Sequence, residues 1–263
     1  MAYAKINSVT NANMAKVSNV AKAAIGKIDN IDAPADGFSN TYSLDFDGSD
    51  DRLVIGDVTI LDGSNTFTIS AWVKFDSLPS TAGAKCLIVS KDEAYELYIK
   101  NTTPASYLFA YLRLNNGPVI ATLELALETD TWYHIAAVHD ENGTAIYLDG
   151  DEAATELGSQ VESIDDTAAS LGIGARAAGS YPMDGHIDEV AIFDAALSAE
   201  DITIIYNSGT PTDLSENSKL VGYWRMGDGA AYPTIPDGSS SGNDGTMTNM
   251  TSGDIVEDVP SGG

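Results

Sequence analysis

The chain has 263 residues, and 43% of them are hydrophobic, which excludes a wholly disordered protein. Its 13 Lys and Arg oppose 39 Asp and Glu, giving a formal net charge of −26, and so acidic a surface argues against nucleic-acid binding. No apolar run approaches the roughly 20 residues of a membrane-spanning helix, which predicts no membrane insertion. The single cysteine, Cys86, excludes an intrachain disulfide.

Residues 1–36 differ from the rest of the chain. They carry a net charge of +1, which leaves −27 for the remainder. Val17, Val20, Ala24 and Ile28 recur at helical spacing, but this apolar stripe is too thin to fold alone. The segment lacks the continuous apolar core of a secretory signal, so we expect no export by that route. Two interpretations stay open, a frayed leader or an anchor arm that becomes ordered on a partner.

Short alternating segments follow from Ser39 to about Asp194, separated by turn residues, and this pattern predicts β-strands. Asn115-Asn116-Gly117 and Asp149-Gly150 are typical of hairpin turns, because Asn, Asp and Gly tolerate positive φ. About ten strands at this spacing predict an all-β fold, a two-sheet antiparallel jelly-roll sandwich. The expected strands are residues 42–47, 66–75, 86–91, 94–100, 107–114, 119–127, 132–139, 145–148, 170–175 and 186–193.

One short helix is predicted after these strands. Ser198 and Asp201 stand at the spacing of a capping box, Ile202 and Ile205 supply an apolar face, and Gly209 ends the segment.

The C-terminal part returns to β character, with strands expected over residues 220–226 and 245–250. We therefore expect three regions along the chain. They are an arm of residues 1–36, a jelly-roll domain of residues 37–209, and a β segment of residues 210–263 that completes or extends the sandwich.

Six segments stand in a familiar order, namely residues 42–51, 67–73, 132–138, 146–150, 171–174 and 185–193. With the helix at residues 196–202, they resemble the laminin-G-like branch of the concanavalin A-like lectin/glucanase superfamily, over roughly residues 40–206. The resemblance implies two antiparallel sheets packed face to face. It does not fix a function, because this fold serves lectins, enzymes, adhesion modules and scaffold domains.

Residues 223–229 and the loop after Asp237 resemble the opening strand and loop of many such domains, yet here they come last. This order, with the Ala-, Asn- and Lys-rich N-terminal segment, resembles laminin-G-like proteins encoded by tailed bacteriophages. The resemblance implies a protein located in the virion, as a head decoration or part of a fibre or other appendage. It also implies a homo-oligomer that contacts other virion proteins through residues 1–36.

A glucanase of this superfamily would resemble Glu-x-Asp-x-x-Glu on a concave strand, where one carboxylate attacks and the other protonates. The nearest stretch is residues 186–191, His-Ile-Asp-Glu-Val-Ala, in which histidine and alanine replace the two glutamates. Neighbours on a regular strand point to opposite faces, so Asp188 and Glu189 are not expected to act as a pair. We expect no catalytic residues and no enzymatic activity.

The resemblance also implies calcium as a cofactor, since many domains of this type hold one ion between loops through carboxylates and carbonyls. Asp47, Asp188 and Asp237 stand where the family's loops supply oxygen ligands. The alternative for all three is that they form turns and carry solvated charge.

Glycan recognition requires exposed aromatic rings with polar groups around them. The candidates are Tyr95, Tyr98, Tyr107, Tyr111 and Tyr181, for which core packing is the alternative. The functional hypothesis is a non-enzymatic bacteriophage virion protein that displays this domain, with host-surface glycans as its ligand class. The alternatives are a free or cell-surface carbohydrate-binding lectin and, third, a glycoside hydrolase.

Overall fold

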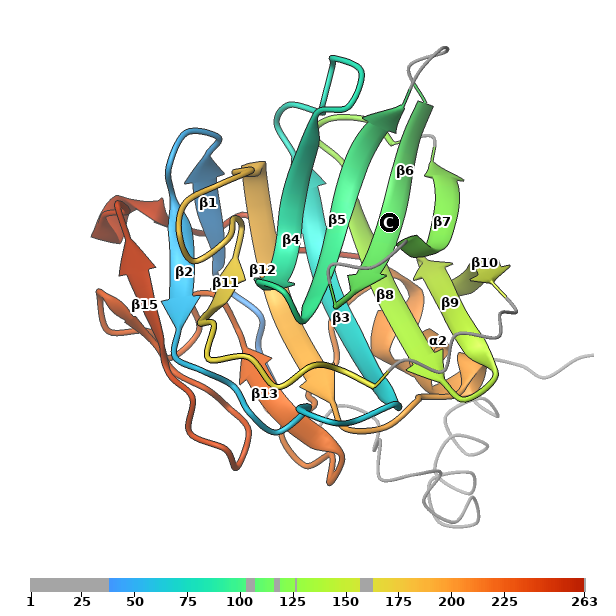
Figure 1. Cartoon of the computed structure of the whole chain (residues 1–263). Helices are drawn as coiled ribbons and strands as arrows, with labels where there is room; N and C mark the ends of the chain where they lie inside the picture. Colours follow the sequence, from blue (N-terminus) through green and yellow to red (C-terminus); the bar gives the residue numbers. More distant parts are fainter. Residues whose placement is uncertain (1–37, 103–106, 116–118, 126, 157–162, 263) are drawn as a thin grey trace, which may run out of the picture.

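Figure 1 shows a computed structural model of the chain. It describes residues 38–262 except 103–106, 116–118, 126 and 157–162. The predicted arm of residues 1–36 lies outside the described residues.

Two eight-stranded antiparallel sheets form the described part of the molecule, which confirms the predicted sandwich. Sheet A contains β1 (Ser43–Asp47), β3 (Phe67–Phe75), β8 (Trp132–Asp140), β9 (Gly143–Leu148), β10 (Asp151–Glu156), β12 (Asp184–Phe193), β13 (Leu220–Trp224) and β16 (Ile255–Val256). Its strands lie in the order β10-β9-β8-β3-β12-β1-β16, and β13 pairs with β12. Sheet B contains β2 (Arg52–Ile55), β4 (Lys85–Lys91), β5 (Tyr95–Thr102), β6 (Tyr107–Leu114), β7 (Val119–Leu125), β11 (Leu171–Ile173), β14 (Thr234–Ile235) and β15 (Gly245–Thr248). Its strands lie in the order β14-β15-β2-β11-β4-β5-β6-β7.

The hydrophobic core fills the space between the sheets, because alternate residues of each strand point inward. Leu44 and Phe46 of β1 enter it from sheet A, and Leu97 and Ile99 of β5 enter it from sheet B. Cys86 lies in the same core, where burial raises the pKa of its thiol to about 12. The thiol therefore stays protonated and unreactive at neutral pH.

The strand β12 changes its neighbour halfway along its length. One edge of β12 pairs with β3, while the other pairs first with β1, through Leu44 and Ile187, and then with β13, through Val190 and Trp224. The strands β1 and β13, from opposite ends of the described chain, thus lie end to end along one edge of β12. The register shifts between Asp188 and Ala191, at the change of neighbour.

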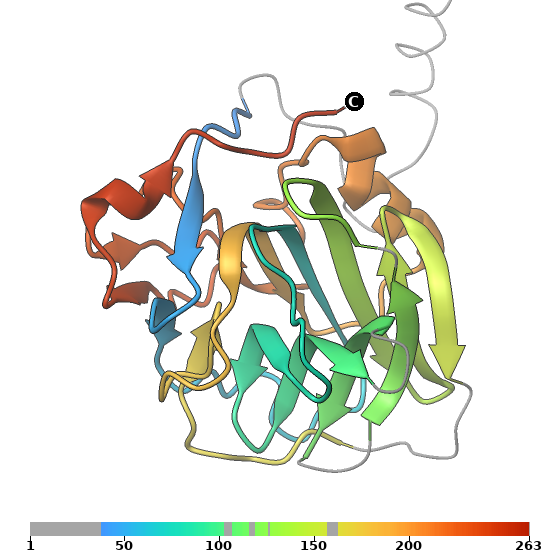
Figure 2. The same cartoon turned by 90° about the horizontal axis from the view of Figure 1, so that it is seen from above.

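The helix α2 (Ala199–Tyr206) covers part of the outer face of sheet A, the face turned away from sheet B (Figure 2). The predicted capping box is confirmed, because Ser198 Oγ accepts the Asp201 N–H and the Asp201 carboxylate accepts the Ser198 N–H. Ile202 and Ile205 join one buried cluster with Phe193 of β12. Two 3-10 turns, η1 (Asn207–Gly209) and η2 (Ser252–Asp254), are the other helical segments described.

The C-terminal chain beyond β16 crosses another part of this outer face (Figure 2). Asp258 accepts hydrogen bonds there from Lys74 of β3 and from Trp132 Nε1 of β8, the latter at 3.0 Å. Across the described ranges, no helix has both the length and the apolar character required to span a bilayer.

Candidate functional site

Asp47, the first predicted calcium ligand, lies at the exposed end of β1. Its Oδ1 accepts hydrogen bonds from the backbone N–H of Ser49 at 2.8 Å and of Asp50 at 3.4 Å. One carboxylate oxygen of Asp47 lies within 4.8 Å of one oxygen each from Asp50 and Asp51. Burial, and then the neighbouring Asp47 charge, raise the pKa of Asp51, although a hydrogen bond from the Asp47 backbone opposes this shift.

Asp237, the second predicted ligand, organises the loop after β14. Its Oδ1 accepts the N–H of Tyr223 at 3.0 Å and of Ser239 at 2.8 Å, and its Oδ2 accepts the N–H of Asn243 at 2.8 Å. These bonds hold the loop against β13. Among the described residues, neither Asp237 nor Asp188 joins the acidic group around Asp47. The three predicted ligands therefore do not form a single ion-binding site, and calcium binding stays a prediction.

Asp188, the third predicted ligand, lies fully buried in β12 beside Glu189. Its carboxylate accepts hydrogen bonds from Asn40 Nδ2 at 2.7 Å and from the Glu189 N–H at 2.8 Å. Glu189 accepts from the Tyr223 hydroxyl and from Arg225 Nε, the latter at 3.0 Å. Burial, and then the Glu189 charge, raise the pKa of Asp188 well above its usual value. Burial raises the pKa of Glu189 to about 7, although Arg225 opposes this shift.

The expectation that Asp188 and Glu189 face opposite sides is wrong. Ile187 and Val190 both enter the core between the sheets, although residues three apart on a regular strand face opposite ways. The register shift and the left-handed φ of Glu189, 46°, place both carboxyls on the outer side. Each carboxyl is nevertheless buried and hydrogen-bonded within the fold, so neither is presented to solvent.

A group that the sequence analysis did not identify lies nearby, on the outer face of sheet A. It combines the carboxylates of Asp45 and Asp76 with the imidazole of His186. Asp45 and His186 are register partners across β1 and β12, and Asp76 follows β3. These positions are far apart in sequence, so only the strand order brings them together.

The five candidate tyrosines occupy different environments. Tyr95 is buried in the core between the sheets, and Tyr98, only 4% exposed, packs with Leu87 on the outer face of sheet B. The side chains of Tyr107 and Tyr111 lie outside the described part of the chain. Tyr181, 44% exposed, lies between β11 and β12 and offers an accessible ring.

Charged groups surround the Tyr181 ring. Lys85 Nζ lies 4.2 Å from the centroid of the Tyr181 ring and 4.6 Å from that of Tyr98, and Arg176 Cζ lies 5.4 Å from the Tyr181 centroid. The Glu96 carboxylate forms ion pairs with both cations. Its Oε2 lies 2.9 Å from Lys85 Nζ, and its Oε1 lies 2.6 Å from Arg176 Nη2. Burial alone would raise the pKa of Glu96, but the two cations lower it.

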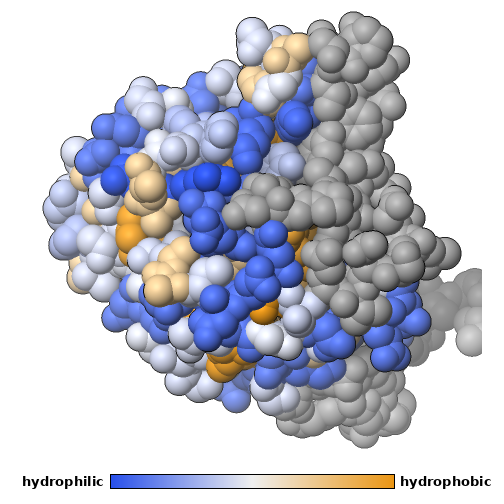
Figure 3. Space-filling view, in the orientation of Figure 1, coloured by the Kyte–Doolittle hydropathy of each residue, from blue (hydrophilic) through white to orange (hydrophobic). Residues whose placement is uncertain are grey.

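Lys85 and Glu96 belong to β4 and β5 of sheet B, and Arg176 and Tyr181 lie in the segment between β11 and β12. Figure 3 views the outer face of sheet B. Hydrophilic residues predominate among the residues coloured there, with scattered apolar spots between them. This face therefore presents an accessible aromatic ring beside charged groups that are already oriented.

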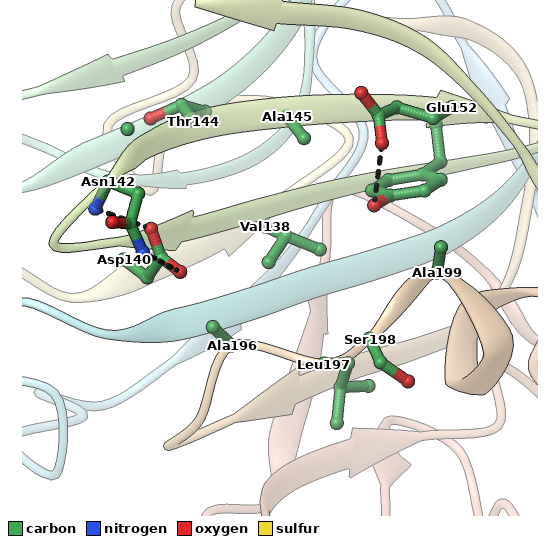
Figure 4. Close-up of a pocket in the computed structure, with 12 residues that line it drawn as sticks. Val138, Asp140, Asn142, Thr144, Ala145, Glu152, Ala196, Leu197, Ser198 and Ala199 are labelled. Carbon is green, nitrogen blue, oxygen red and sulfur yellow. Dashed lines mark hydrogen bonds between the residues drawn. The ribbon is translucent and has the colours of Figure 1, made fainter. Parts of the chain in front are cut away.

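A pocket of about 360 Å³ lies on the outer side of sheet A, between the β8–β9 hairpin and the start of α2 (Figure 4). Asp140 and Asn142 lie at one end and Glu152 at the other, with apolar side chains between them. Asn142 donates to Asp140, and the hydroxyl of the buried Tyr147 donates to Glu152 at 3.5 Å. Tyr147 is the aromatic side chain among the lining residues described, and its ring is not exposed.

A model of a laminin-G-like family, described as the concanavalin A-like lectin/glucanases superfamily, matches residues 47–203. The chain belongs to this superfamily. The match runs from the end of β1 into α2, so the laminin-G-like match stops before β13. No curated protein matches the sequence.

Solved structures share this laminin-G-like fold at low sequence identity. A Bacteroides ovatus protein described as carbohydrate-binding is 20% identical, with a TM-score of 0.64, over 85% of this chain and 62% of that chain. The heptameric SAP-like pentraxin of Limulus polyphemus is 14% identical, with a TM-score of 0.51, over 65% and 84%. The enzymatically active domain of tailspike protein 2 from bacteriophage CBA120 is 16% identical, with a TM-score of 0.52, over 80% and 35%. The chain thus spans only part of the first and third proteins, and these likenesses establish the fold alone.

Proposed function

We propose that this chain is a non-enzymatic glycan-binding protein that holds sugars on the outer face of sheet B, around Tyr181. The observation that carries the proposal is the accessible Tyr181 ring, framed by Lys85, Arg176 and Glu96. The C–H face of a sugar ring packs against an aromatic ring, and a few fixed polar groups orient its hydroxyls.

Pre-orientation of the charged groups favours this face as the site. Glu96 binds both cations, and Arg176 also contacts Asp92 at 3.1 Å, so these side chains are held in place before a ligand arrives. Groups that are ordered in advance lose less conformational entropy on binding. Among the residues described, the pocket beside α2 offers no accessible ring, and its Asn142 and Tyr147 already donate to Asp140 and Glu152.

The surroundings of the acidic pair support binding rather than catalysis. A retaining or inverting glycosidase needs two carboxyls on either side of the scissile bond. Asp188 and Glu189 are instead buried and engaged by Asn40, Tyr223 and Arg225. Membership of a superfamily that includes lectins is consistent with this role.

The variant Tyr181→Ala is expected to bind glycans at least tenfold more weakly than the wild type, a loss of about 1.4 kcal/mol, because it removes the stacking surface. Glycans that bind the wild type are first selected on an array, in calcium and again with a chelator, and affinities are then measured by calorimetry. Asn142→Ala, in the pocket beside α2, is the matched control and should retain wild-type affinity. Loss of affinity in Asn142→Ala with full affinity in Tyr181→Ala would place the sugar in the pocket and refute the proposed face.

We also propose that the protein is located in a bacteriophage virion, as a head decoration or part of a fibre or other appendage. Residues 1–36 would contact other virion proteins, and the displayed domains would form a homo-oligomer. Support comes from the +1 charge of residues 1–36 against the −27 of the remainder, and from the fold shared with a phage tailspike domain. A free or cell-surface lectin is the alternative.

Limited trypsin treatment of virions that contain this protein tests the anchoring role. Residues 1–36 contain four lysines, whereas lysines such as Lys91 are buried within the fold. Trimming of residues 1–36 is expected to release the folded domain into the supernatant, as followed by mass spectrometry. Retention of the trimmed domain on the virion would refute the anchoring role.

A further inference from the structure

Three neighbouring strands bring two carboxylates and an imidazole together on the outer face of sheet A. His186 on β12 is the register partner of Asp45 on β1, and Asp76 follows directly after β3, the strand on the other side of β12. One ligand atom from each of these residues lies within 4.8 Å of those from the other two.

The His186 imidazole is buried without a hydrogen bond. The residue is 8% exposed, and its Nδ1 has no hydrogen-bond partner among the described residues. Its Nε2 lies 3.7 Å from Asp76 Oδ1, which is too long for a hydrogen bond. Neither ring nitrogen of His186 is therefore used by a hydrogen bond within the described residues, so binding of an ion by this ring would break none. His134 Nδ1 also has no partner among the described residues, but each of the other two rings makes one hydrogen bond, from His134 Nε2 to Ser70 at 2.8 Å and from His139 Nδ1 to Thr144 at 2.7 Å.

The charges around Asp45 favour a cation at this position. The carboxylates of Asp76, Asp184 and Asp254 lie close enough to Asp45 for their charges to act on it. These carboxylates repel one another, and a bound divalent ion would offset that repulsion. Lys74, the register partner of His186 on β3, is engaged by Asp258 rather than by this group.

We propose that Asp45, Asp76 and His186 bind a divalent transition-metal ion such as Zn²⁺. Imidazole nitrogen and carboxylate oxygen together suit zinc and related ions, whereas calcium takes oxygen ligands. The side chain of Asp76 is 44% exposed, so solvent reaches the group and water completes the coordination. A bound ion would link β1, β12 and the segment after β3, and would stabilise the folded state. This inference does not depend on glycan binding or on the predicted calcium ligands.

Nuclear magnetic resonance of the histidine rings tests the proposal, because the chain has three histidines. Titration of the full chain with Zn²⁺ alone should shift the His186 ring signals, with saturation at one equivalent. The ring signals of His134 and His139 should stay unchanged, and Ca²⁺ at the same concentrations should leave His186 unshifted.

Two matched variants separate this site from general attraction to an acidic surface. Asp76→Asn is expected to weaken the Zn²⁺ affinity seen at His186 at least tenfold. Because the Asp76 side chain is exposed, the substitution should leave the fold intact. Asp50→Asn removes a carboxylate from the group around Asp47 and should leave the affinity unchanged. An unshifted His186, a titration without saturation at one equivalent, an equal shift with Ca²⁺, or equal affinity in Asp76→Asn would each overturn the proposal.

Discussion

Replacing Trp224 with alanine is expected to lower the free energy of unfolding by about 3–5 kcal/mol, the usual cost of emptying a large buried aromatic site. Trp224 ends β13, is fully buried in the core between the sheets, and donates through Nε1 to the Asn243 carbonyl at 2.9 Å. The loss should be so large because the C-terminal strand supplies part of the central core. Urea unfolding of wild type and variant measures it.

Ile60→Ala is the matched control for this measurement. Ile60 is 49% exposed, so its truncation should change the free energy of unfolding by no more than about 0.5 kcal/mol. If Trp224→Ala cost less than about 1 kcal/mol, β13 would not be part of the cooperative core, and the packing described for the C-terminal segment would be incorrect.

The wild type is expected to lose about 2–3 kcal/mol of unfolding free energy between pH 5 and 7.5, relative to the variant Glu189→Gln. Burial raises the pKa of Glu189 from 4.5 to about 7 in the folded state. The folded protein therefore holds this proton at pH values where the unfolded chain has released it. The stabilising contribution of the protonated group is complete at low pH and is lost as the pH rises through this window.

Urea unfolding of both proteins at the two pH values provides the measurement. Differences between variant and wild type cancel the titration of the carboxylates that are distant from Glu189. Glu216→Gln, which removes one exposed negative charge, is the control and should follow the wild type. A pH dependence in Glu189→Gln equal to that of the wild type would show that Glu189 has the same pKa in both states.

Long strands with regular alternation could be predicted closely from the sequence. β3 spans Phe67–Phe75 against an expected 66–75, and β12 spans Asp184–Phe193 against an expected 186–193. The short strands β2, β14 and β16 were not predicted as separate strands. A segment of two to four residues carries too little periodicity of its own, and its partners in the sheet determine that it is a strand.

The candidate site was less predictable because it depends on register and on irregular backbone. The alternation rule failed at Asp188 and Glu189, where a bulge and a positive φ place both side chains on one side. The Asp45–Asp76–His186 group depends on three strands that meet only in the folded sheet. Tyr181 was a candidate by residue type, but its exposure and its neighbours Lys85 and Arg176 follow from tertiary packing.

A crystal structure of the protein with an oligosaccharide chosen from the glycan array tests the central claim most directly. We expect an uncleaved glycan with one sugar ring against Tyr181 and polar contacts to Lys85 or Arg176. An oligosaccharide bound in the pocket beside Asn142, or cleaved beside Asp188 and Glu189, would contradict the account.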